Sequence, residues 1–256
     1  HCGEEALTPP TSSYVICGTP RSGSTLLCEM LARTGVAGRP NSYFREQDVG
    51  YWASRWHVEP EELTSAEFNT AYLQAMQREG SAGTGIFGLR IMWPSVATAV
   101  KRLADASGKK LPFRAAIEEQ FGPTAYIYLR RTDKLHQAVS LVRAQQSGVW
   151  HLHPDGTIFE GTDTPAAVVY DRKLLANTVD DLQRQDNAWN VLFGEQHIEP
   201  LSLEYEWITA DPRAALAKVL SAIGRDPAVA GSARIPTAKM ADGISREWIA
   251  RFQRGE

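Results

Sequence analysis

The chain has 256 residues, of which 43% are hydrophobic and 22% charged, and its formal net charge at pH 7 is −3. This balance is typical of a globular protein with a sizeable core, and the length predicts one large domain. The slight negative charge argues against a general nucleic-acid binder, so any anion site must be a local cluster of arginines. No apolar run approaches the roughly 20 residues of a membrane span.

Cysteine usage and the amino-terminal residues give two further expectations. The three cysteines, Cys2, Cys17 and Cys28, form neither a disulfide framework nor a zinc-ligand spacing. No charged segment followed by an apolar stretch marks a leader peptide, so a cytoplasmic location is expected. Residues 1–12 are polar, contain Pro9 and Pro10, and are predicted to be a flexible arm before a single domain at 13–256.

The first half of the domain begins with a predicted buried strand at 13–17, followed by a glycine-containing loop and a helix that ends near Gly35. Residues 39–62 mix aromatic residues, arginine and glutamate and fit no regular element. A helix is predicted at 65–80 and a strand at 85–93.

The second half alternates strands and helices in the same way. Two strands are each followed by a helix, namely strand 124–131 with helix 132–146, and strand 198–206 with a helix from Asp211 to Gly224. Further helices are predicted at 172–193 and 245–253, and residues 151–165 are predicted to be an exposed loop with a lid as a candidate role. Apolar strands alternating with helices predict an α/β fold, a doubly wound parallel sheet with helices on both faces.

The segment VICGTPRSGSTLLCEML, residues 15–31, carries the strongest signal of function. Gly18 and Gly23 are spaced as in a nucleotide-triphosphate loop, where they let the backbone curl around an oxyanion in front of a helix amino terminus. The position of the loop lysine is Ser24, however, and the strong cation of the loop is Arg21.

An arginine in place of the lysine limits the class of ligand that the loop is expected to bind. Arginine is a planar, bidentate and permanently charged clamp, whereas the triphosphate loop uses lysine together with Mg²⁺. The strand 124–131 ends in Arg130 and Arg131 and carries no metal-binding aspartate. The pattern favours a metal-free site for a phosphate monoester that bears another group over a site for Mg-ATP.

A second anion site is indicated by Arg131, at the end of a strand, and Ser140, in the following helix. Two anion sites after two strands of one sheet fit a nucleotide with phosphates at two positions. The alternative is that Arg131 is a surface cation and Ser140 an ordinary helix residue.

Five segments resemble the bacterial sulfotransferases, specifically the trehalose 2-sulfotransferase family. They are PRSGSTLL with TGVAGRP, GLRIMW, QAVSLVRAQQSGVW, QDNAWNVLF and SREWIARF, in the family's order and over nearly the whole chain. The resemblance implies a fold that binds 3′-phosphoadenosine 5′-phosphosulfate as co-substrate, a hydroxyl acceptor on a carbohydrate or glycolipid, no metal, and a homodimer.

Site residues carry over from the resemblance position by position. The 5′-phosphosulfate would be cradled by the loop residues Thr19, Pro20, Arg21, Ser22, Gly23, Ser24 and Thr25. Arg131 and Ser140 would hold the 3′-phosphate, and the segment around Lys239 and Met240 would close over the nucleotide. A solvated lysine is the alternative for Lys239.

The general base is where this sequence departs from the family, because Ser42 stands at the family's glutamate. Serine with an ordinary pKa cannot serve as a base unaided. Glu46, four residues on, is the first candidate, with an exposed loop carboxylate as its alternative. His57, His153 and the acceptor's own chemistry are the other candidates.

The candidates for the acceptor side are Ser42, Arg90 and Trp93. Arg90 stands where the family has a lysine, and the alternative for it is an ordinary pair with a carboxylate. Trp150 and Trp189 could stack on a sugar, but tryptophans at helical spacing more often belong to the core. His151 and His153 lack a third ligand and do not predict a metal site.

Two rival functions stay open on the sequence. The first is a small-molecule kinase of the nucleotide-loop type, against which the absent loop lysine counts. The second is an inactive relative that binds the nucleotide, which Ser42 favours.

Overall fold

The computed structural model describes residues 12–58, 65–152, 158–162, 164–236 and 243–256. Its centre is a four-stranded sheet in the order β2-β1-β3-β6, in which every adjacent pair is parallel. The strands are β1 (Ser13–Gly18), β2 (Phe87–Met92), β3 (Thr124–Arg130) and β6 (Leu201–Glu204). The predicted parallel α/β sheet is confirmed.

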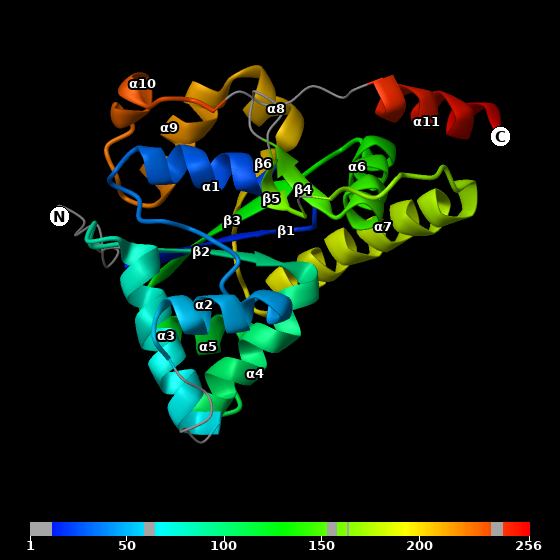
Figure 1. Ribbon diagram of the computed structural model, residues 1–256. Helices are drawn as coiled ribbons and strands as arrows, with labels where there is room; N and C mark the ends of the chain where they lie inside the picture. Colours follow the sequence, from blue (N-terminus) through cyan, green and yellow to red (C-terminus); the bar gives the residue numbers. More distant parts are fainter. Residues whose placement is uncertain (1–11, 59–64, 153–157, 163, 237–242) are drawn as a thin grey trace.

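Helices cover both faces of this sheet (Figure 1). On one face lie α1 (Ser24–Arg33), α8 (Tyr205–Ala210), α9 (Pro212–Ala222) and α10 (Val229–Ser232). On the other lie α3 (Ser65–Ser81), α4 (Val96–Ser107), α5 (Phe113–Phe121) and the second half of α7 (Arg172–Glu195). Side chains alternate along a strand, so β1 contributes to the core on both faces. Tyr14 and Ile16 pack on the face covered by α1, and Val15 and Cys17 on the face covered by α3.

A third packing unit lies beside the sheet, where α6 (Lys134–Ser147) contacts the first half of α7 and α11 (Gly243–Arg254). Next to it β4 (Val149–Leu152) and β5 (Ile158–Gly161) pair antiparallel. The predicted loop at 151–165 is therefore partly strand, and the rest of that prediction falls largely outside the described residues.

The predicted helices at 65–80, 132–146, 172–193 and 245–253 are confirmed by α3, α6, α7 and α11. The helix after Asp211 is confirmed as α9, where the Asp211 carboxylate accepts a hydrogen bond from Ala214 N–H, as expected of a helix cap. The irregular segment 39–62 contains a 3₁₀ turn at Glu46–Asp48 and helix α2 (Val49–Arg55). None of the helices in the described ranges combines the length and the apolar character that a bilayer crossing demands.

One strand prediction is too long at both ends. Strand 198–206 is observed only at Leu201–Glu204, and α8 begins at once with Tyr205. The carboxylate of Glu206 accepts hydrogen bonds from the N–H groups of Thr132 and Asp133, each at 3.3 Å. These bonds tie α8 to the loop that follows β3.

The same bonds set the acidity of Glu206. Partial burial alone would raise its pKa, but hydrogen bonds from its own N–H and from those of Thr132 and Asp133 outweigh burial and lower the pKa below its ordinary value of 4.5. A carboxyl with a lowered folded-state pKa stabilises the fold above its unfolded-state pKa. That stabilisation disappears as pH falls through the folded-state pKa.

Glu206→Gln should therefore lower the free energy of unfolding by about 1 kcal/mol at pH 7, because a charge-assisted acceptor is lost. The deficit should shrink as pH falls below 4.5 and through the lower folded-state pKa, where the wild-type carboxyl in the folded protein becomes protonated. Urea unfolding at a series of pH values measures both. The control is Glu204→Gln, whose carboxylate is 49% exposed and 3.5 Å from Arg130, and which should change stability little. A deficit that is constant with pH would contradict this assignment.

Candidate functional site

Four strand ends meet at the carboxyl edge of the sheet, and each is followed by a residue of interest. The glycine loop follows β1, Trp93 follows β2, Arg131 follows β3 and Tyr205 follows β6. The order β2-β1-β3-β6 places the reversal of strand order between β1 and β3. Open α/β sheets bind ligands in the crevice at such a reversal.

The loop between β1 and α1 has an unusual backbone. Arg21 has φ of 65° and Gly23 φ of 88°, both in the left-handed region. No side chain caps α1 at Gly23, so the dipole and first-turn N–H groups of the helix face the loop. A Cβ at Gly23 would lie 2.3 Å from Cδ2 of Tyr205, so this position requires glycine. The loop has the shape of an anion cradle.

Buried side chains from two helices hold the start of this loop. The side-chain amide of Gln137, in α6, donates to Thr19 Oγ1 at 2.9 Å and to the Pro20 carbonyl at 2.7 Å. The indole N–H of Trp189, in α7, donates to the Gly18 carbonyl at 2.8 Å. Gln137 and Trp189 are both fully buried. Trp189 is thus a core residue, as its helical spacing favoured.

The side chain of Arg21 links the two predicted anion sites. Its Nε donates to Ser140 Oγ at 3.0 Å, and Nη1 donates to the carbonyl of Trp150 at 2.6 Å. Arg21 and Ser140 are 119 positions apart in the chain, and the structure places them in direct contact.

Arg131 reaches the same region through Tyr205. The guanidinium carbon of Arg131 lies 4.6 Å from the centre of the Tyr205 ring, which in turn packs on Gly23. The three residues form a continuous wall from the loop to Arg131. Tyr205 was missed by the sequence analysis. The one feature that could have revealed Tyr205 is its place in the chain, directly after a strand that ends at this edge.

Arg90 and Ser42, the predicted acceptor-side residues, are in direct contact. Nε of Arg90 donates to Ser42 Oγ at 2.6 Å, and Nη1 donates to Thr25 Oγ1 at 2.7 Å. Arg90 thereby joins the irregular segment to the end of the glycine loop. Within the loop, Ser24 Oγ lies 3.7 Å from the sulfur of Met92, and Ser22 Oγ is buried with no hydrogen-bond partner in the structure.

Glu46 has a different neighbour. Its side chain is 67% exposed, and its carboxylate lies 3.1 Å from Nη2 of Arg102, an ion pair between the 3₁₀ turn and helix α4. Trp93 packs edge-on against Trp189 with ring centres 5.3 Å apart. His57 is exposed after α2, whereas His153, Lys239 and Met240 lie outside the described residues.

Neither described thiol is a candidate nucleophile. Cys17 and Cys28 are free and buried, and burial raises the pKa of the Cys28 thiol to about 11. In the described ranges no three His, Cys, Asp or Glu side chains gather as a metal site would require.

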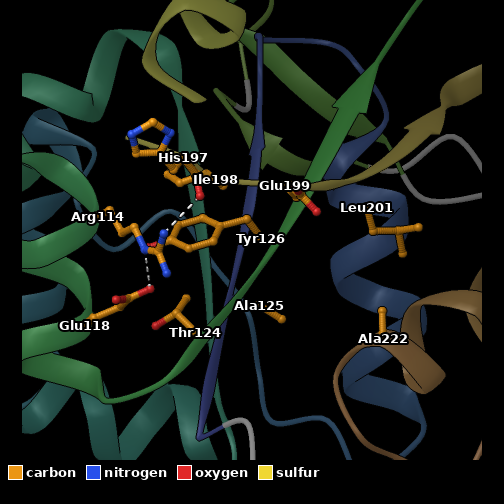
Figure 2. A pocket seen from close by; sticks show the side chains of 10 residues that line it. All are labelled: Arg114, Glu118, Thr124, Ala125, Tyr126, His197, Ile198, Glu199, Leu201 and Ala222. Atoms are coloured by element: carbon orange, nitrogen blue, oxygen red, sulfur yellow. Dashed lines mark hydrogen bonds and ion pairs between the residues drawn. The ribbon is translucent and has the colours of Figure 1, made fainter. Parts of the chain in front are cut away.

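A cavity of about 390 Å³ lies at the opposite, amino edge of the sheet, by the first residues of β3 and β6 (Figure 2). Its cation, Arg114, lies 2.9 Å from Glu118 and donates to the carbonyl of His197. The charges of Arg114 and Glu118 are paired, and the glycine loop and the amino terminus of α1 lie at the other edge of the sheet. This cavity is therefore not the candidate site.

Comparisons with known proteins agree with one another. The family model described as Stf0 sulphotransferase matches residues 13–255. The trehalose 2-sulfotransferase of Mycobacterium tuberculosis (strain ATCC 35801 / TMC 107 / Erdman) is 30% identical over 260 residues, 94% of each chain. That of Mycolicibacterium smegmatis (strain ATCC 700084 / mc(2)155) is 28% identical over 263 residues, 95% of each chain.

Among solved structures, the sulfotransferase domain of the Synechococcus PCC 7002 olefin synthase aligns over 95% of both chains. Its identity of 17% and TM-score of 0.45 make this likeness too weak to carry an argument. The family match needs no support from it, since it extends over residues 13–255 and thus from β1 to the end of α11. The chain belongs to the Stf0 sulphotransferase family.

Proposed function

We propose that this sulfotransferase takes its sulfuryl group from 3′-phosphoadenosine 5′-phosphosulfate and transfers it to a hydroxyl of a carbohydrate or of a glycolipid headgroup. The observation that carries the proposal is the hydrogen bond between Arg21 Nε and Ser140 Oγ. It joins the glycine loop to the helix after Arg131, so that one nucleotide with two phosphates can bridge both anion sites.

On the donor side, the loop from Thr19 to Thr25 would receive the 5′-phosphosulfate, and Arg131 with Ser140 the 3′-phosphate. The buried, unpartnered Ser22 Oγ and the uncapped first turn of α1 supply donors for the loop site. Lys239 and Met240 complete the proposed set as the residues that cover the nucleotide.

On the acceptor side, two contacts bring the segment after α1 next to the loop. Ser42 is held by Arg90, which also holds Thr25, and the guanidinium of Arg45 lies 5.9 Å from the centre of the Trp150 ring. The carbonyl of that same Trp150 accepts from Arg21. We place the acceptor hydroxyl between this segment and Arg21, with Ser42, Arg90 and Trp93 as its neighbours. The relatives named trehalose 2-sulfotransferase support a carbohydrate as the acceptor class.

In the transfer, the acceptor oxygen forms a bond to sulfur while the bond from sulfur to the 5′-phosphate oxygen breaks. Negative charge grows on that phosphate oxygen, which Arg21 and the loop N–H groups are placed to stabilise. The products are the sulfate ester and adenosine 3′,5′-bisphosphate, and the acceptor proton passes to a general base.

Glu46 is the proposed base. It follows a turn that begins at Ser42, where Arg45 N–H donates to the Ser42 carbonyl at 3.1 Å, and its carboxylate is exposed. Ser42 itself accepts from a guanidinium that cannot be deprotonated, so it is a poor proton acceptor. For Glu46 to act, its carboxylate must leave Arg102.

The first prediction concerns the donor nucleotide. Adenosine 3′,5′-bisphosphate at one hundred times its Kd should stabilise the protein by about 2.7 kcal/mol, whereas 5′-AMP at the same concentration should stabilise it less. Thermal unfolding with each nucleotide and with Mg-ATP measures this. Stabilisation by Mg-ATP alone would favour a kinase and overturn the proposal.

The second prediction concerns Arg21. Arg21→Ala should lower kcat by about 10²–10³-fold, because the charge that develops in the transition state loses its main side-chain partner. The Kd of the bisphosphate should rise much less. The matched control is Arg33→Ala at the other end of α1, where the arginine pairs with Glu29 at 3.3 Å on the surface. Near-normal turnover in Arg21→Ala would defeat the assignment.

The third prediction separates chemistry from structure at Glu46. Glu46→Gln should lower kcat by about 10²-fold with an unchanged Kd for the bisphosphate, as expected for the loss of a base. Arg102→Met breaks the same ion pair but leaves the carboxylate, so it should keep its turnover. Equal losses in the two variants would show that the ion pair, and not the base, matters.

A further inference from the structure

Behind the glycine loop, four side chains form a closed ring of hydrogen bonds, here called the buried ring: Thr19, Lys134, Gln137 and Asp186. Lys134 Nζ lies 2.6 Å from Asp186 Oδ2 and donates to Gln137 Oε1 at 3.0 Å. Gln137 Nε2 donates to Thr19 Oγ1 at 2.9 Å, and Thr19 Oγ1 closes the ring on Asp186 Oδ1 at 3.5 Å.

The ring is almost completely enclosed. Thr19 and Gln137 are 0% exposed, and the side chains of Lys134 and Asp186 are each 13% exposed. One positive and one negative charge make it neutral overall. The third N–H of Lys134 donates to the backbone carbonyl of Arg131 at 2.6 Å, which uses up the donors of the ammonium group. Lys134 is therefore committed to the ring, although it stands only three residues after Arg131.

The ring touches the backbone of both proposed phosphate subsites. On the 5′ side, Gln137 holds the carbonyl of Pro20, the residue directly before Arg21. On the 3′ side, Lys134 holds the carbonyl of Arg131. Asp186 comes from α7, so the ring ties the loop after β1 and the loop after β3 to a third element.

We infer that Lys134, Gln137 and Asp186 are positioning residues that fix the spacing between the two phosphate subsites. The inference rests on the proposed function, since it assumes a donor nucleotide that occupies both subsites. A ligand with two anchors gains from the second anchor only if the spacing is right, because the second contact then forms at high effective concentration. Errors of about 1 Å in such spacing are costly.

The measurable consequence is the ratio between two affinities. Adenosine 3′,5′-bisphosphate uses both subsites, whereas 5′-AMP uses only the loop. The wild-type protein should bind the bisphosphate more tightly than 5′-AMP, and the ratio of the two Kd values reports the coupling between the subsites. A loss of ring contacts should reduce this ratio by about five- to tenfold, because the bisphosphate loses more affinity than 5′-AMP does.

Two variants break the ring in different ways. Gln137→Met removes the donors to Thr19 and Pro20 without stranding a charge. The double variant Lys134→Met/Asp186→Asn removes both charges together, because removal of one partner alone would leave a buried charge unpaired. Isothermal titration with both nucleotides gives the ratios, and thermal unfolding shows that each variant is folded.

A matched control removes the same two residue types from the surface. Lys101→Met/Asp105→Asn breaks an ion pair of 2.6 Å within α4, where the lysine is 74% exposed, and should leave the ratio unchanged. The inference would be overturned if both ring variants kept the wild-type ratio, or if they lost equal affinity for the two nucleotides. Either result would leave the proposed function standing. A wild-type protein without preference for the bisphosphate would overturn both.

Discussion

The left-handed backbone at Arg21 is the constraint on which the site depends. With φ of 65°, a non-glycine residue is strained by roughly 1 kcal/mol or more, so other contacts must hold it there. They come from outside the loop. The arginine side chain is bound to Ser140 and to the Trp150 carbonyl, and Gln137 holds the carbonyl of the preceding Pro20. The shape of the cradle is thus set by helix α6 as much as by the glycines.

Local patterns and long-range contacts differ in how far the sequence reveals them. The buried strand before Gly18 and the long helix α7 were predictable, because each depends on hydrophobic periodicity within a short window. Helix α4 was not assigned, although Val96, Ala99, Val100 and Leu103 recur at helical spacing and all pack against the core. Tyr205 could not be assigned to the site, because its role depends on a contact with Gly23. The two residues lie far apart in the chain, and no local pattern encodes their contact.

The two sides of the site are built differently. On the proposed donor side, buried side chains such as Gln137 and Trp189 fix backbone carbonyls, so the positions of the loop atoms are set by the core. On the proposed acceptor side, the side chain of Glu46 is about two-thirds exposed, so its carboxylate can leave Arg102 for water at little cost in free energy.

The arginines at the carboxyl edge differ from those elsewhere in the groups with which they interact. Several arginines elsewhere in the described chain pair with carboxylates, among them Arg33 with Glu29 and Arg114 with Glu118. At the edge, Arg130 also pairs with Glu204, but Arg131 lies on the ring face of Tyr205, and Arg90 donates to the neutral oxygens of Ser42, Thr25 and Asn41. A carboxylate partner would cancel the potential and would have to be displaced before an anion could bind. Neutral partners orient the guanidinium groups while leaving their charge available, so a chain with a net charge of −3 can still offer positive charge to the proposed anionic nucleotide.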